Sequence, residues 1–209
     1  TATNIPFRWQ SLSGIEKHML NFLENHDEQR IASEFFAGNP FKAIPAMVVS
    51  ACMNTNPVMV YFGQELGEAG MDEEGFSGRD GRTTIFDYWT IDTIRRWRNG
   101  GKFDGKLLTK EEKKLQGFYS TLLNLCNKEK AIREGVFFDL TYGNLEGIVV
   151  NEHKQYAFFR KSGKDLIFIV VNFDENPAAP SVKIPTHAFE YLGIPFKENY
   201  KAKDLLTGN

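Results

Sequence analysis

The chain has 209 residues, which is enough for one large domain or two modest ones. A net charge of −2 predicts no broad basic face and argues against nucleic acid as a partner, and no apolar run is long enough to span a membrane. Two cysteines, Cys52 and Cys126, lie in apolar, helix-like stretches, so we expect two buried thiols rather than a disulfide framework. Because the chain starts at Thr1, without Met and without a signal-peptide pattern, we expect a piece of a longer protein, and its localisation is left open.

Aromatic residues are abundant, at 13% of the chain. The first interpretation is a bulky core, because aromatic side chains bury large areas. The second is that some rings form platforms for a ligand such as a sugar. Composition alone leaves both interpretations open.

The first part of the chain predicts a strand, a helix and a second strand. After a short helix or loop at 5–18, the run 19–25 is apolar at its start and polar at its end, which is typical of a buried strand with a functional carboxyl end. Residues 40–54 have the length and composition of a buried helix, with Pro45 tolerated in the first turn. The apolar run 57–63 predicts the second strand. This order and spacing indicate a βαβ unit with a parallel pair.

The middle of the chain is irregular and then strongly helical. Residues 64–105 are rich in glycine and charge and predict a long loop, which in a compact domain usually has a function. From Thr109 to residue 132 apolar side chains recur at helical spacing. Thr109 is the expected N-cap, with Glu112 as its capping-box partner.

After Gly135 the apolar pattern changes to a period of two. Strands are expected at 136–142, 155–161, 165–173, 181–185 and 201–209. Residues 162–165 (SGKD) predict a hairpin turn, and 186–195 predict a turn of helix. The chain therefore divides into an α/β part, 1–134, and an antiparallel β part, 135–209.

The first predicted strand ends in three hydrogen-bonding residues, Asn25, His26 and Asp27. The carboxyl ends of parallel strands form the edge of a barrel or sheet at which ligands bind. An alternative is that His26 and Asp27 cap the next helix, as Asp often does. The spacing leaves both interpretations open.

The order of several motifs resembles the α-amylase family, glycoside hydrolase family thirteen. FLENHDEQR at 22–30 and PVMVYFGQELG at 57–67 are similar to the seventh and eighth strand ends of that family's barrel, and GRDGRTTIFDYW at 78–89 resembles the segment that follows. The β-rich end, with VVNF and DLLTG, resembles the family's small antiparallel domain. The resemblance implies the last part of a (β/α)8 TIM barrel, strands 7 and 8 with helices, followed by a small antiparallel β-sandwich.

The resemblance also implies roles for individual residues. Asp27 matches the family's third catalytic carboxylate, which binds sugar hydroxyls and supports an oxocarbenium-like transition state. His26 and Asn25 fall in the same sugar-binding subsite. Arg30 falls where oligosaccharide-acting members carry an arginine, and Arg82 is expected either to contact substrate from the later loop or to pair with its neighbours.

Two further carboxyl groups are needed for a retaining mechanism, a nucleophile and an acid/base about 5 Å apart. The family carries both before the Asn-His-Asp motif, whereas only 26 residues precede Asp27 here. Asp80 lies after both strands, in the wrong order, and we interpret it as unrelated to these roles. The resemblance thus implies the C-terminal part of a retaining α-amylase-like hydrolase that is inactive by itself.

The implied substrates are α-1,4-linked glucans such as starch, glycogen and maltooligosaccharides. The alternatives are an α-glucosidase or glucosyltransferase of the same family, a non-catalytic carbohydrate-binding module in 135–209, and a plain structural domain there. Calcium is frequent in the family but its usual ligands lie mostly upstream, so no metal or other cofactor is assigned to this chain. Unpaired barrel edges predict self-association.

Overall fold

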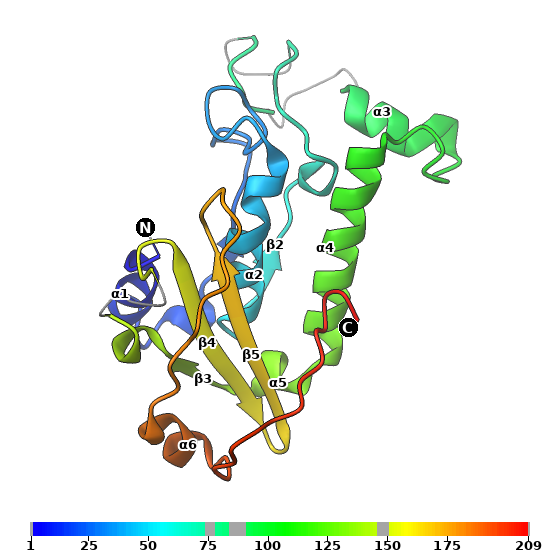
Figure 1. Ribbon diagram of the computed structural model, residues 1–209. Helices are drawn as coiled ribbons and strands as arrows, with labels where there is room; N and C mark the ends of the chain where they lie inside the picture. The colour runs from blue at the N-terminus through cyan, green and yellow to red at the C-terminus, as the bar shows by residue number, and fades with distance from the viewer. Residues whose placement is uncertain (1, 74–77, 84–90, 146–150, 209) are drawn as a thin grey trace. The chain divides into compact units, whose positions relative to one another are not determined.

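The computed structural model describes residues 2–73, 78–83, 91–145 and 151–208 (Figure 1). The chain forms two compact units, each assembled from separate stretches of sequence. One comprises Thr1–Met19, Val48–Pro57 and Leu123–Asn209, and the other comprises Leu20–Met47 and Val58–Leu122. The domain boundary expected near residue 134 stays a prediction.

The regular elements of the described residues are short, apart from one long helix. The α-helices are α1 (Asn4–Ser11), α2 (Ile44–Cys52), α3 (Asp92–Arg98), α4 (Lys110–Lys128), α5 (Lys130–Glu134) and α6 (Thr186–Leu192). The 3-10 turns are η1 (Glu16–His18), η2 (Pro40–Ala43), η3 (Gln64–Leu66), η4 (Asn99–Gly101) and η5 (Thr141–Gly143). The strands are β1 (Asn21–Phe22), β2 (Val58–Met59), β3 (Val136–Asp139), β4 (Gln155–Ser162) and β5 (Asp165–Asn172). No described helix combines the length and apolarity needed to cross a membrane.

The predicted parallel pair is confirmed: β1 and β2 lie parallel, with Asn21 opposite Val58. Each strand is only two residues long, shorter than expected, because in the described residues these strands pair only with each other. The helix between them is confirmed, entered through η2. Asn39 Oδ1 accepts a hydrogen bond from Phe41 N at 2.9 Å, and Pro45 is the second residue of α2, where no intrahelical N–H bond is lost.

The capping box of α4 is confirmed. Glu112 Oε2 accepts from Thr109 N at 2.8 Å, and Thr109 Oγ1 accepts from Glu112 N at 3.1 Å. The single helix predicted as far as residue 132 is wrong, however, because Glu129 has extended backbone angles and separates α4 from α5. The break buries Ala131 and turns its carbonyl oxygen towards Arg160. A tertiary contact therefore outweighs the local preference to continue the helix.

Strands β3, β4 and β5 form an antiparallel sheet in that order (Figure 1). The hairpin predicted at 162–165 is confirmed, with Ser162 opposite Asp165. Its turn places Gly163 at φ +56°, in the left-handed region that glycine tolerates. The central strand β4 is buried from residue 155 to 160, because neighbours pair with both of its edges.

Two of the strands expected in the β-rich part are wrong. Residues 181–185 form no strand, because Lys183 N and O both bond to the side-chain amide of Asn144, at 2.8 and 3.0 Å, instead of to another backbone. Residues 201–208 form none either, because Asp204 Oδ1 accepts from Leu206 N at 2.9 Å and closes a turn. The described residues thus hold one three-stranded antiparallel sheet, and a second, facing sheet is not among them.

Each unit has its own apolar cluster. The unit with the antiparallel sheet buries side chains from β3, β4 and α6, namely Phe138, Leu140, Ala157, Phe159, Ala188 and Leu192. The other unit buries a smaller set, namely Leu66, Ile91, Ile94 and Leu108. Burial of these faces supplies the main stabilisation of each unit.

A buried arginine, Arg160, occupies the middle of β4. Its guanidinium donates to the carbonyl oxygens of Met53 and Ile132 at 2.7 Å each and of Ala131 at 3.2 Å. Burial lowers the pKa of Arg160 to about 10, since the charged form loses water. The three carbonyl groups replace that water and join α5 and the residue after α2 to the sheet.

Candidate active site

The Asn25–Asp27 motif forms a turn that begins three residues after the end of β1 at Phe22. Asn25 Oδ1 accepts hydrogen bonds from Asp27 N and Glu28 N, both at 2.9 Å. Asn25 therefore has a structural role: its side chain fixes the backbone turn that carries His26 and Asp27. The side chains of His26 and Asp27 are 41% and 66% exposed, and His26 Nε2 lies 3.4 Å from Asp27 Oδ2. An imidazole and a carboxylate are thus held side by side, within reach of a ligand.

The base of this turn is closed by a buried carboxylate, Glu24. Its Oε1 accepts from Ile31 N at 2.6 Å, so that the two ends of the segment 24–31 are fastened together. Its Oε2 lies 3.5 Å from Arg30 Nε. Burial raises the pKa of Glu24, and the charge of Arg30 opposes that rise. Glu24 is a residue that the sequence analysis did not single out, although it stands in the same cluster of polar groups.

Arg30 is fully enclosed, with 0% of its surface exposed. Its Nη2 donates to Phe62 O at 2.7 Å, its Nε lies 3.4 Å from Glu68 O, and its Cζ lies 4.8 Å from the centre of the Tyr61 ring. These groups all follow β2, so Arg30 joins the segment after β1 to the segment after β2. The enclosed guanidinium holds these two segments together, and the contact with sugar expected for Arg30 stays a prediction.

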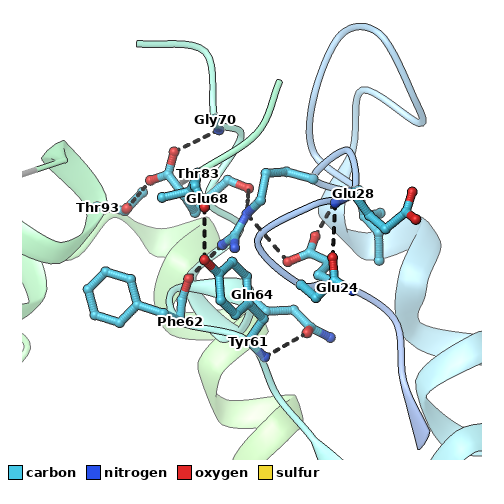
Figure 2. Close-up of polar contacts among 12 residues, drawn as sticks. Glu24, Glu28, Tyr61, Phe62, Gln64, Glu68, Gly70, Thr83 and Thr93 are labelled. Carbon is cyan, nitrogen blue, oxygen red and sulfur yellow. Dashed lines mark hydrogen bonds and ion pairs between the residues drawn. The ribbon is translucent and has the colours of Figure 1, made fainter. Parts of the chain in front are cut away.

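The segment after β2 is itself held by buried polar groups (Figure 2). Glu68 accepts hydrogen bonds from Gly70 N, at 2.8 Å, and from the hydroxyl of Thr93 at the start of α3. Gln64 donates to the hydroxyl of Tyr119 on α4 at 2.9 Å. Burial raises the pKa of Tyr119 to about 12, so the hydroxyl stays protonated at neutral pH. The segment that follows β2 is therefore held in place by hydrogen bonds to α3 and α4.

Part of the glycine-rich loop predicted at 64–105 packs against the Asp27 segment. Residues 74–77 and 84–90 of that loop lie outside the described residues. Arg30 N donates to Gly81 O at 2.7 Å, and Gln29 Nε2 donates to Asp80 O at 2.6 Å. Gly81 has a φ of +79°, and a Cβ there would lie 2.3 Å from Oγ of the buried Ser33, so this position favours glycine.

Arg82 is half-buried in the same loop, and its backbone N donates to Asp80 Oδ1 at 3.1 Å. Its Nε is buried and has no hydrogen-bond partner among the described residues. The bond to Asp80 involves only the backbone of Arg82, so both expectations for its side chain, contact with substrate and pairing with its neighbours, stay predictions. In the described part of the chain, no group of three or more His, Cys, Asp or Glu side chains is arranged to hold a metal ion.

Comparison with known proteins gives the class of this chain. A model of the alpha amylase catalytic domain matches residues 7–135, and the chain therefore belongs to the alpha-amylase family. The resemblance of the chain to that family is thereby confirmed. A search of curated proteins found no match. Membership implies a portion of a TIM barrel, a glycoside hydrolase-like function and glycans as the class of ligand.

Proposed function

We propose that this chain is the C-terminal part of a retaining glycoside hydrolase that acts on α-1,4-linked glucans such as starch, glycogen and maltooligosaccharides. One observation carries the proposal: in a chain of the alpha-amylase family, Asp27 and His26 are exposed side by side at the end of a parallel strand. Asp27 is the carboxylate that accepts hydrogen bonds from sugar hydroxyls. Its negative charge stabilises the positive charge that develops on the sugar ring in the transition state.

The remaining candidate residues support Asp27 in different ways. His26 Nε2 lies beside the carboxylate and shares the contact with the sugar, and Asn25 shapes the turn. Arg30 holds the turn against the segment after β2. Arg82, half-buried in the glycine-rich loop that packs against this segment, is the candidate for a substrate contact from that loop. The nucleophile and the acid/base come from barrel strands that precede Asn25 in the family's order, so the chain by itself is inactive.

The stereochemistry of the product tests this proposal. The full-length protein should hydrolyse maltoheptaose to products that first appear as the α-anomer, because two successive inversions retain configuration. Proton NMR at early times distinguishes the anomers, and the 209-residue chain alone should release no product. Initial release of the β-anomer, or turnover by the chain alone, would contradict the proposal. Release of glucose only, or formation of longer oligosaccharides, would favour the α-glucosidase or glucosyltransferase alternative.

We also infer how this chain takes part in the family's fold. β1 and β2 correspond to strands seven and eight of the barrel, and residues 135–209 to the family's antiparallel sandwich domain. The family match supports the boundary, since it ends at residue 135, between α5 and β3. In the described residues the two parallel strands pair only with each other, and unpaired edges recruit other strands. The isolated chain should therefore self-associate, and light scattering that gives a monomer mass across micromolar concentrations would contradict this.

A cluster of exposed aromatic rings favours a second candidate function, binding of glucan by the β-rich part. Tyr142 and Tyr191 are 51% and 58% exposed, and His187 is exposed between them in the sequence. All three rings surround the buried ring of Phe138, with centroid distances of 6.2, 5.4 and 5.7 Å respectively. The exposed rings can stack on the apolar faces of a sugar, and the tyrosine hydroxyl and histidine imidazole groups can form hydrogen bonds with its hydroxyls. These residues lie beyond the segment that the family model matches.

Electrophoresis in a gel that contains soluble starch tests the aromatic cluster. The full-length protein should carry Asp27→Asn, so that it digests the starch more slowly during the run, by about 10²-fold or more. Adding Tyr142→Ala and Tyr191→Ala should reduce its retardation, because the ring contacts are lost. The matched control is Phe196→Ala, which removes a ring that is 78% exposed but lies outside the cluster. Equal retardation of the tyrosine variant and the control would show that the aromatic cluster does not bind starch. The β-rich part would then have only a structural role.

A further inference from the structure

Two thiols that are far apart in sequence are in contact in the structure. Cys52 is the last residue of α2, and Cys126 lies in the last turn of α4. Their Sγ atoms are 3.8 Å apart, although 74 positions separate them in the chain. Both are free thiols, and both belong to the same compact unit. The sulfur atoms therefore touch without a covalent bond.

The two thiols differ in accessibility. Cys52 is 2% exposed, whereas Cys126 is only half-buried, so a reagent in solution reaches Cys126 first. The hydrogen bond between them raises the pKa of Cys52 and lowers the pKa of Cys126, and burial adds to the rise at Cys52. Cys126 thus loses its proton more easily than Cys52. Since the thiolate is the nucleophile, the more accessible thiol is also the more reactive one.

We propose that Cys126 is a site of covalent modification by low-molecular-weight disulfides, and that Cys52 resolves the product to an intramolecular disulfide between α2 and α4. The geometry carries this assignment: one accessible thiol is backed by a second, enclosed thiol at contact distance. Such an arrangement of attacking and resolving cysteines is typical of redox-sensitive thiol pairs. The inference does not depend on the glucan substrate.

The chemistry proceeds by two thiol–disulfide exchanges. The Cys126 thiolate attacks one sulfur of oxidised glutathione, a new S–S bond forms, the glutathione S–S bond breaks, and one glutathione thiolate leaves. Cys52 then attacks the Cys126 sulfur and gives up its proton, which passes to the departing second glutathione thiolate. Two protein thiols are oxidised and one glutathione disulfide is reduced to two thiols.

The disulfide is compatible with the fold and has a measurable consequence. A disulfide places its sulfur atoms about 2.05 Å apart, so the two sulfur atoms, now 3.8 Å apart, must come about 1.8 Å closer for the bond to form. The bond closes a long loop between α2 and α4, and closing a long loop restricts the unfolded chain. The oxidised protein should therefore unfold at a higher temperature than the reduced protein.

Mass spectrometry of the full-length protein tests the proposal. After incubation of the folded protein with oxidised glutathione, alkylation and non-reducing digestion, the wild type should yield a crosslinked peptide pair that contains Cys52 and Cys126 and has lost two hydrogen atoms. Cys52→Ser should stop at the first exchange and carry one glutathionyl group on Cys126. Cys126→Ser should leave Cys52 free and alkylated only after unfolding in urea.

Three results would overturn the proposal. The first is that both cysteines of the wild type, treated with oxidised glutathione while folded, are fully alkylated once the protein is unfolded in urea. The second is that the crosslinks join Cys126 of different molecules. The third is that Cys52, and not Cys126, retains glutathione in the single variants. The wild-type measurement needs no substitution, so the proposal can fail even where a variant does not fold.

Discussion

Replacing Asp27 with asparagine should lower kcat/KM of the full-length protein on maltooligosaccharides by about 10²-fold or more. Asparagine keeps the shape of the side chain but removes the negative charge that stabilises the transition state. The loss should fall mainly on kcat, because this charge matters most when positive charge develops on the sugar ring. Steady-state kinetics on maltoheptaose measures both parameters.

The stability of the Asp27→Asn variant should be nearly unchanged. The Asp27 side chain is 66% exposed, and surface substitutions of this kind change the free energy of unfolding by about 0.5 kcal/mol or less. The turn also survives, because it rests on Asn25 Oδ1 and the backbone N of residue 27, neither of which is altered. A loss of activity can therefore be separated from a loss of folded protein by urea denaturation.

A neighbouring carboxylate provides the matched control. Glu28 is exposed and lies one position further along the same turn. Glu28→Gln removes one negative charge from the same surface and should leave kcat/KM close to that of the wild type. If both variants lose activity equally, or if Asp27→Asn retains full activity, Asp27 is not the stabilising carboxylate.

Replacing Arg30 with methionine should destabilise the protein by about 3–5 kcal/mol. Methionine fills much of the volume, but Glu24 is then buried without its counterion, and Phe62 O loses its donor. Removing one member of a buried ion pair is costly because the other charge stays away from water. The free energy of unfolding from urea denaturation, followed by tryptophan fluorescence, measures the change.

The destabilisation by Arg30→Met should diminish at acidic pH. Burial raises the pKa of Glu24 above its ordinary value of 4.5, and without the charge of Arg30 this rise is opposed only by the hydrogen bond from Ile31 N. Near pH 4.5 the unpaired carboxyl group is protonated in the folded variant, so the cost of a buried charge disappears, whereas at pH 7 that cost is fully present. A difference between variant and wild type that does not change from pH 7 towards pH 4.5 would contradict the ion-pair interpretation.

A double variant separates the ion pair from simple packing. Glu24→Gln combined with Arg30→Met removes both charges, and the coupling energy between the two sites should be about 0.5–3 kcal/mol. Arg30→Lys keeps the positive charge but lacks the planar guanidinium with its several donors. Its free energy of unfolding should therefore lie between those of Arg30→Met and the wild type. If Arg30 positions the Asp27 turn, the folded Lys variant should also show a lower kcat with little change in KM. Additive effects of the two single substitutions would show that Glu24 and Arg30 act separately.

Local patterns in the sequence predicted much of what positions the site. The polar residues after an apolar run predicted that Asp27 would lie at the end of a parallel strand, and in the structure it is exposed in the turn that follows such a strand, five residues after Phe22. The Thr109 capping box and the hairpin around Gly163 are likewise decided by residues within three or four positions of each other. Such features depend on backbone angles and short-range hydrogen bonds, which neighbouring residues determine.

Contacts between distant residues decided the rest. The burial of Arg30 depends on Phe62 and Glu68, more than thirty residues away, and no nearby residue indicates it. The end of α4 depends on a carbonyl contact with Arg160 in β4, and the contact of Cys52 with Cys126 spans 74 positions. A single sequence gives the polarity of each of these side chains but not its partner. Partners are chosen by the satisfaction of buried polar groups across the packed chain, which only the tertiary structure specifies.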